Sequence, residues 1–170
     1  FVCTIGLALA FIGINLLYLA IGKNTGDILF FDNLHTYALQ ANPIWLKISF
    51  LLILVGFSVK MGLAPMHTAD IDANDNASSP VAAMISGSLL NVGALAIYRF
   101  YTIFQVQGLQ RWMSNVLMIT ALLTLSVAAI YMLAVKNYKQ MFAYSSIEHM
   151  GLAALMISLG SAGKSIFFLH

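Results

Sequence analysis

The sequence has very little charge. Its 170 residues include eight Lys or Arg and six Asp or Glu, so 8% are charged, whereas 61% are hydrophobic. Soluble domains carry about 25% charged residues, and so few charges cannot cover the surface of a soluble fold. The composition therefore excludes an ordinary cytosolic enzyme, a disordered chain and a nucleic-acid binder, which would need a basic face. A polytopic membrane protein is the class that remains.

Cysteine is almost absent, and so are the motifs of bond-making chemistry. A single cysteine, Cys3, excludes a disulfide framework and a CxxC metal site. The sequence contains no Ser-His-Asp grouping, phosphate-binding loop, metal cluster or flavin motif. We therefore expect no cofactor, no metal and no bond-making chemistry performed by the chain itself.

Long hydrophobic runs are what the sequence has in abundance. A helix needs about 20 apolar residues to cross a bilayer, and runs of this length favour helices over the strands of a membrane barrel. We expect an all-α, polytopic transmembrane bundle that forms a single domain and is an excerpt of a longer protein. The predicted spans are 1–22, 46–66, 80–103, 112–135 and 141–160, and a sixth span starts at 165–170.

The connections between these spans distribute their charges unequally over the two sides of the membrane. Those at 23–47, 105–111 and 161–164 lie on one side, and those at 67–79 and 136–140 lie on the other. An excess of basic residues marks the inner side. The count weakly favours the first group inside, because it holds Lys23, Lys47, Arg111 and Lys164.

Lys60 is a charge that the bilayer should reject. By helical rise it lies about 20 Å into the second span, where a charge costs roughly 2.5–3.5 kcal/mol on insertion scales. Pro65 removes a helix hydrogen bond nearby, and Gly62 adds a second weak point. The pattern predicts a broken helix at about 61–68, with Lys60 facing the third span around Ser86–Asn91. A snorkelling lysine is the plainer alternative, but it does not explain the break.

Three further polar residues fall in the middle of predicted spans. Glu148 and its neighbour His149 lie about 13 Å deep, and Asn91 lies about 16 Å deep, by helical rise. Ser145 shares a helix face with His149, as Tyr144 does with Glu148. A lone polar residue is often only an interhelical contact, but Glu followed by His favours a role in handling protons or ordering water. Asn91 can order water but cannot titrate.

The polar residues near the membrane edges have plainer interpretations. His67 follows the break, where it is either the entrance of a proton relay or a hydrogen-bonding loop residue. Arg99 reaches the opposite interface and is interpreted as a snorkelling side chain. Asp70, Asp72 and Asp75 resemble a weak cation site in an acidic loop, but the glycine and terminal glutamate of an EF-hand are absent. We therefore interpret them as solvated charges.

Lys60, Asn91 and the Glu148–His149 pair come from three spans and fall in the middle part of the bilayer. A row of polar groups across the membrane plane is what a lateral proton path needs. A lysine suits such a path, because its affinity for a proton depends strongly on burial and on nearby carboxylates.

Two separated motifs resemble one known family. GFSVKMGLAPMHT, a short acidic segment and SPVAAMISGSLLNVGALAIYRF are similar to the core of the proton-conducting membrane subunits of respiratory complex I, Mrp-type antiporters and membrane-bound hydrogenases. YKQMFAYSSIEHMG resembles a second motif of that family, and its Ile-Glu-His form, with Asn91 before it, is similar to the hydrogenase-4 component F branch. The resemblance covers essentially the whole chain.

The resemblance implies an excerpt from helix six to helix eleven of a longer subunit. It implies that Lys60 is the family's buried lysine on a broken helix and that His149 is the histidine of a later helix. Such a subunit moves protons or cations in response to redox chemistry in partner subunits of a complex I-like or hydrogenase complex. The implied location is the bacterial or archaeal cell (inner) membrane, with 67–79 and 136–140 on the cytoplasmic side.

This sequence departs from the family pattern at several positions. Asn91 stands where many relatives carry a titratable Lys or His. The segment after the break has Ala69, Asp70-Ile71, Asn74 and Ser78 where the pattern has Trp, Leu-Pro, His and Pro.

Two other functions fit the same residues. A secondary transporter of a small solute also uses broken helices at mid-membrane, and it should have a cavity of ligand size. A structural membrane anchor of a redox complex should tolerate the loss of Lys60.

Overall fold

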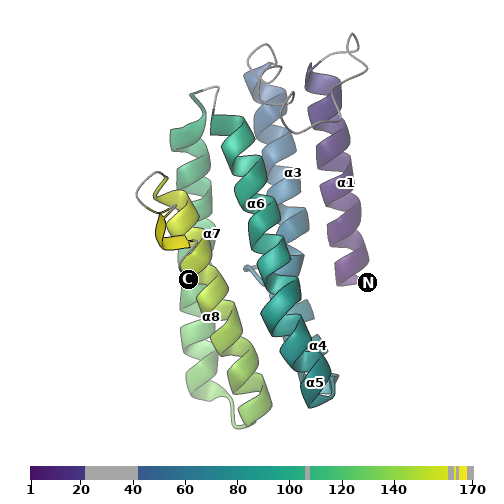
Figure 1. Ribbon diagram of the computed structural model, residues 1–170, viewed down its shortest axis with the longest axis vertical. Coiled ribbons are helices and arrows are strands. Elements are labelled where there is room, and N and C mark those ends of the chain that lie inside the picture. The colour runs from purple at the N-terminus through teal and green to yellow at the C-terminus, as the bar shows by residue number, and fades with distance from the viewer. Residues whose placement is uncertain (22–41, 106–107, 161–162, 164, 168–170) are drawn as a thin grey trace.

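The computed structural model describes residues 1–21, 42–105, 108–160, 163 and 165–167, which form helices joined by short turns and contain no strand (Figure 1). The predicted connection at 23–41 lies outside the described residues, and so does most of the predicted sixth span. The helices are α1 (Val2–Ile21), α3 (Pro43–Met61), α4 (Thr68–Asn76), α5 (Ser79–Met84), the π-helical turn η2 (Ile85–Leu89), α6 (Leu90–Phe104), α7 (Gln110–Ala134) and α8 (Tyr138–Ser158).

Four helical segments are long and apolar enough to cross a membrane, which confirms the predicted all-α membrane bundle. They are α1, α3, the continuous run of α5, η2 and α6, and α7. The helix α8 has 21 residues, a sufficient length, but it carries more polar side chains than the others. That α8 also crosses the membrane stays a prediction.

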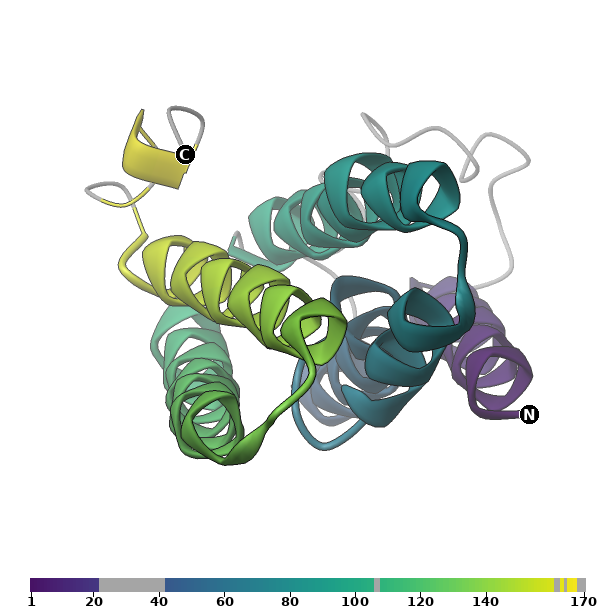
Figure 2. The same ribbon diagram turned by 90° about the horizontal axis from the view of Figure 1, so that it is seen from below.

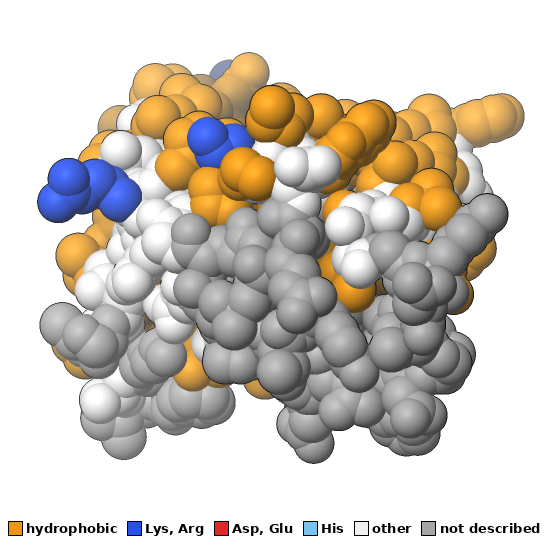
Figure 3. Space-filling view, turned by 90° about the horizontal axis from the view of Figure 1, so that it is seen from above, with side chains coloured by type: hydrophobic (Ala, Val, Ile, Leu, Met, Phe, Trp, Pro, Cys, Tyr) orange, Lys and Arg blue, Asp and Glu red, His pale blue; other side chains and the backbone are white. Residues whose placement is uncertain are grey.

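The long helices lie side by side along the longest axis of the molecule (Figure 1). Viewed along that axis, α1 pairs with α3, α7 pairs with α8, and α6 joins the two pairs (Figure 2). One end of the bundle holds the starts of α3 and α7, and the other holds α4, α5 and the turn between α7 and α8 (Figure 1). The first end shows basic side chains among hydrophobic ones (Figure 3). Among the described residues, α4 and the turn between α7 and α8 thus lie at the end opposite the start of α7, while the predicted connections at 23–41 and 161–164 lie largely outside the described residues.

Small residues let α1 and α3 approach each other closely. A Cβ atom added to Gly56 would lie 2.5 Å from the backbone nitrogen of Ala10 and 2.6 Å from its Cβ. The Ser49 hydroxyl donates a hydrogen bond of 2.7 Å to the Gly13 carbonyl in the same interface. Small residues and interhelical hydrogen bonds are the usual means of packing helices in lipid, so this contact fixes α3.

The predicted break in the second span is present. The helix α3 ends at Met61 because Gly62 adopts a left-handed conformation, with φ of 72°. The backbone N–H groups of Gly62 and Leu63 both donate to the Ser58 carbonyl, the second over 2.9 Å. Such a glycine cap is a common helix end. Residues 62–67 then form turns before α4 begins.

The predicted acidic loop at 67–79 is wrong, since residues 68–76 form α4. This helix packs against α8, where Ile71 joins a buried cluster with Tyr144 and Ile147. Asp70 is only 6% exposed, so its interpretation as a solvated charge is also wrong. A short helix gains most of its stability from tertiary packing, and the local sequence does not reveal that packing.

The third span contains an irregularity that the sequence analysis does not predict. It runs as α5, the π-helical turn η2 and α6. Such turns are frequent at functional sites in helices. The Asn91 side chain donates a hydrogen bond of 2.7 Å to the Gly87 carbonyl within this turn, so the predicted water-ordering amide is also a support of the turn.

We expect Gly56→Ala to destabilise the protein by about 1–3 kcal/mol, since the added methyl group would overlap the backbone of α1. Thermal unfolding in detergent measures the change. Gly87→Ala is the matched control, because nothing lies within 4 Å of its added Cβ. Equal melting temperatures for the two variants would contradict the proposed close approach of α1 and α3.

Candidate functional site

Lys60 lies in the last turn of α3, where that helix meets α6. A Cβ added to Gly93 would lie 3.1 Å from the Lys60 carbonyl carbon and 3.3 Å from the Lys60 Cβ. Gly93 is two residues beyond Asn91, so this part of α3 faces the third span close to the predicted region. Lys60 is half-buried and makes no hydrogen bond or ion pair with any residue that the structure describes.

Thr124 supports the break and was missed by the sequence analysis. It lies fully buried in α7, and its hydroxyl accepts a hydrogen bond of 3.0 Å from the Ala64 N–H. The same hydroxyl donates to the Thr120 carbonyl over 2.7 Å. Non-helical backbone at membrane depth needs such partners within the protein. No local signal distinguishes Thr124 from Thr120, because only the fold brings one of them to the break.

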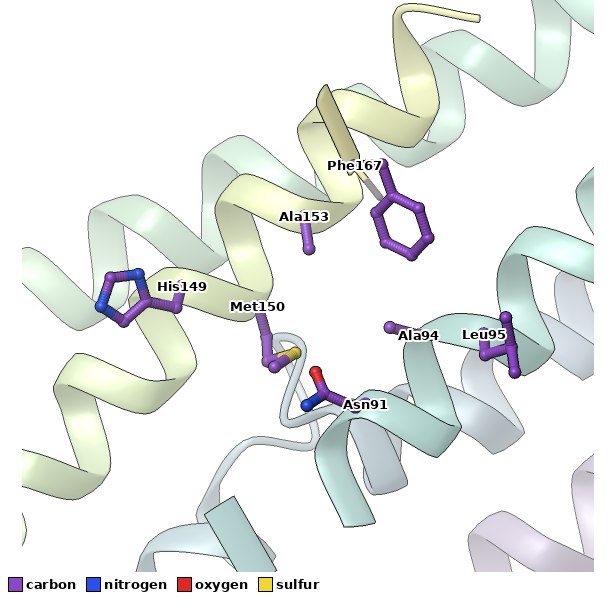
Figure 4. A pocket seen from close by; sticks show the side chains of 7 residues that line it. All are labelled: Asn91, Ala94, Leu95, His149, Met150, Ala153 and Phe167. Atoms are coloured by element: carbon purple, nitrogen blue, oxygen red, sulfur yellow. The ribbon is translucent and has the colours of Figure 1, made fainter. Parts of the chain in front are cut away.

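A first cavity of about 510 Å³ lies between α6 and α8. Its polar residues are Asn91 and His149, which come from the two facing helices. Asn91 and Met150 approach each other across the gap, and His149 lies at one end (Figure 4). The remaining lining residues are apolar: Ala94, Leu95, Met150, Ala153 and Phe167.

A second cavity of about 530 Å³ lies between α8 and the segment formed by α4, α5 and η2. His149 also lines this cavity, so the two cavities share that residue. Lys139 and Tyr138, from the start of α8, line it as well. Its other polar lining residues are Asn74, Ser79, Ser86, Ser145 and Ser146. Polar side chains therefore extend from the start of α8 through His149 to Asn91.

Glu148 lies apart from this polar lining. It is half-buried and lines neither cavity, because adjacent residues project about 100° apart around a helix. Ser145 and His149 share a cavity, as their predicted common face requires. His149 and Asn91 thus line the same cavity, and Glu148 does not.

His67 occupies the turn between Lys60 and α4. Its Nδ1 atom is buried and has no hydrogen-bond partner among the described residues. Burial lowers the pKa of the imidazole, and the nearby Pro65 carbonyl offsets this only in part. The role of His67 as the entrance of a proton relay stays a prediction.

Comparison with known proteins identifies the family. Residues 1–170 match the family described as NADH:quinone oxidoreductase/Mrp antiporter, TM. The chain belongs to this family. The resemblance drawn from the two sequence motifs is therefore confirmed, and the antiporter-family chain is integral to the membrane.

Individual relatives agree with this assignment. A hydrogenase-4 component F homolog from Methylacidiphilum infernorum is 32% identical over 93% of this chain and 34% of its own length. NAD(P)H-quinone oxidoreductase chain 4 from Gloeobacter violaceus is 30% identical over 85% of this chain and 30% of its own length. The chain thus spans about a third of the curated relatives that it matches.

A solved structure extends the comparison to the fold. A chain of the membrane-bound sulfane sulfur reductase, an archaeal respiratory membrane complex, superposes with a TM-score of 0.83 at 30% identity. The match covers 92% of this chain and 31% of that chain.

We expect Thr124→Val to loosen the break, because it leaves the Ala64 N–H without its acceptor at a typical cost of about 1–3 kcal/mol. Hydrogen–deuterium exchange of residues 62–67 should become faster, and the melting temperature should fall. Thr120→Val is the matched control, since its hydroxyl bonds only the Leu117 carbonyl of its own helix. Unchanged exchange in Thr124→Val would contradict this role.

Proposed function

We propose that this chain is part of a membrane subunit that moves protons, or other cations, in response to redox chemistry in partner subunits. The observation that carries the proposal is the pair of cavities that share His149, beside a break that follows Lys60. Family membership supports it, and the relatives are named as parts of hydrogenase and quinone oxidoreductase systems. The partners proposed are other membrane subunits of such a complex.

Lys60 is the proposed central carrier of the path. A buried ammonium is costly unless an opposite charge or polar groups lie near it. Movement of a nearby charge therefore changes the affinity of Lys60 for its proton, which lets the lysine load and unload. The packing of Lys60 against α6 keeps it within the bundle, near the Asn91 end of the first cavity.

His149 is proposed to relay protons between the two cavities, because an imidazole can accept a proton at one nitrogen and donate from the other. Asn91 orders water in the first cavity without titrating. His67 serves as the entrance at the break, and Glu148 tunes the path by its charge from the adjoining face of α8. Waters complete the path, since ordered water bridges polar groups almost as well as direct contact.

Transport of a small solute is the second candidate, because both cavities fall in the range of about 300–1,000 Å³ typical of ligand sites. Vesicles containing the complete complex distinguish the two. A solute carrier moves protons when solute is added without redox substrate, whereas a redox-driven subunit moves them only during electron transfer.

We expect Lys60→Ala in the complete protein to abolish or strongly reduce proton pumping, because alanine cannot carry charge across the membrane plane. Electron transfer by the partner subunits should fall less. Ion movement into vesicles, recorded together with redox turnover, measures both. Arg99→Ala is the control, since a snorkelling arginine lies outside the path, and pumping should stay nearly intact.

Normal pumping by a well-assembled Lys60→Ala complex would overturn the proton path and favour the membrane-anchor function. The loss of pumping should also be larger for a residue that carries a proton than for one that only orders water. Asn91→Ala should impair pumping less than Lys60→Ala, since Asn91 only orders water.

We expect His149→Leu to impair pumping more than Glu148→Gln, because His149 is the described residue that lines both cavities and a glutamine can still order water. The same vesicle assay gives the ratio of protons moved to electrons transferred. The reverse order of the two variants would show that the path follows the Glu148 face of α8.

A further inference from the structure

Asp70 is a buried carboxylate to which no role has yet been given. It lies in the first turn of α4 and is 6% exposed. No basic side chain forms an ion pair with it within the described part of the chain. A buried charge without a partner is costly, so the position of Asp70 needs an explanation.

A chain of hydrogen bonds leads from Asp70 to the second cavity. The Asn74 side-chain amide donates to the Asp70 Oδ2 over 3.2 Å and to its backbone carbonyl over 3.1 Å. The Ser86 hydroxyl, from the π-helical turn, donates to the Asn74 Oδ1 over 3.4 Å. Asn74 and Ser86 line the cavity that contains His149. The Asn74 side chain is therefore the single group that separates Asp70 from the second cavity of the proposed path.

Asp70 also lies next to the end of the helix that carries Lys60. A Cβ added to Gly62 would lie 3.9 Å from the Asp70 Cβ, and Gly62 is two residues beyond Lys60. Asp70 is therefore next to the end of α3 and is hydrogen-bonded to Asn74, which lines the second cavity. The Oδ1 atom of Asp70 accepts no hydrogen bond from a described residue, which leaves it open to a proton.

The electrostatic setting suits a group that changes its charge. Burial raises the pKa of Asp70 to about 6, and the hydrogen bond from the Asn74 amide opposes this rise only in part. The neutral and charged forms therefore lie close in free energy near neutral pH. The titratable groups on the helices packed against α4 are Lys47 and Lys60 on α3, and Tyr138, Lys139, Tyr144, Glu148 and His149 on α8; α5 has none. Those beside Asp70 on its own segment are His67, Asp72 and Asp75.

We propose that Asp70 is a further proton-carrying residue, which passes protons between the second cavity and the Lys60 end of α3. The inference rests on the proposed function. In each cycle the carboxylate binds one proton from the cavity water and becomes neutral. Once Lys60 has released its own proton onward along the path, Asp70 gives its proton to that amine, through water, and returns to the carboxylate. A purely structural Asp70 would only stabilise the start of α4, as an acidic residue does there.

The test is Asp70→Asn in the complete subunit within its assembled complex. Asparagine keeps the shape and hydrogen bonding of the site but cannot carry a proton. We expect the rate of proton movement at equal redox turnover to fall by about 100-fold or more, as with the loss of a positioned proton-transfer group, and Asp70→Glu to restore much of it. Asp72→Asn is the matched control, because Asp72 is exposed on the same helix, and it should pump normally.

A spectroscopic measurement distinguishes a proton-carrying Asp70 from an Asp70 that only stabilises α4. Infrared difference spectra over a pH titration should show a protonated carboxyl band that Asp70→Asn removes and Asp72→Asn retains. If Asp70→Asn fails to assemble, Asn74→Leu takes its place, since it breaks the link to Ser86 while keeping Asp70. Normal pumping by the assembled variant overturns the inference, and so does a band that Asp70→Asn leaves unchanged.

The Lys60→Ala variant, measured in the same assay, distinguishes this inference from the proposed function. Loss of pumping in Lys60→Ala with normal pumping in Asp70→Asn rejects Asp70 as a carrier and leaves the proton path standing. Normal pumping in both variants rejects Asp70 as a proton carrier and also rejects the proton path through Lys60.

Discussion

The absence of water in the bilayer core is the constraint on which the rest of this structure depends. Every backbone group there needs a partner within the protein, so a helix can be broken only where neighbours replace the lost hydrogen bonds. Here Gly62 turns the chain so that two N–H groups bond the Ser58 carbonyl, and Thr124 of α7 accepts the Ala64 N–H. The break beside Lys60 is therefore a supported feature of the bundle.

The supported break in turn allows polar groups of α4 to lie beside α8 and the π-helical turn. It lets α4 leave the line of α3 and pack against α8, where Asn74 meets the π-helical turn through Ser86. Of the two cavities that share His149, one lies between α8 and the segment of α4, α5 and η2, and the other lies between α8 and α6. In this member of the NADH:quinone oxidoreductase/Mrp antiporter family, polar side chains therefore line a cavity on each side of His149.

Two of the residues that set this chain apart from its family pattern are in direct contact. Asp70 and Asn74 stand where the pattern has Leu and His, and they are hydrogen-bonded to each other in the buried face of α4. The titratable side chain of Asp70 therefore lies one helical turn before the position where the pattern has His. This shift links the sequence departure to the proton-carrying role that we propose for Asp70.

The sequence by itself determined the helical spans, because the thickness of the bilayer sets the length of an apolar run, and it determined the break, because Gly62 and Pro65 act on the local backbone. The motifs around Lys60 and His149 were also enough for the family. Only the tertiary structure decided that residues 68–76 form a helix, that Asp70 is buried, that Thr124 supports the break and that His149 and Glu148 have different surroundings. Each of these depends on which distant helix supplies the neighbouring atoms, and that contact leaves no periodicity or motif in the local sequence.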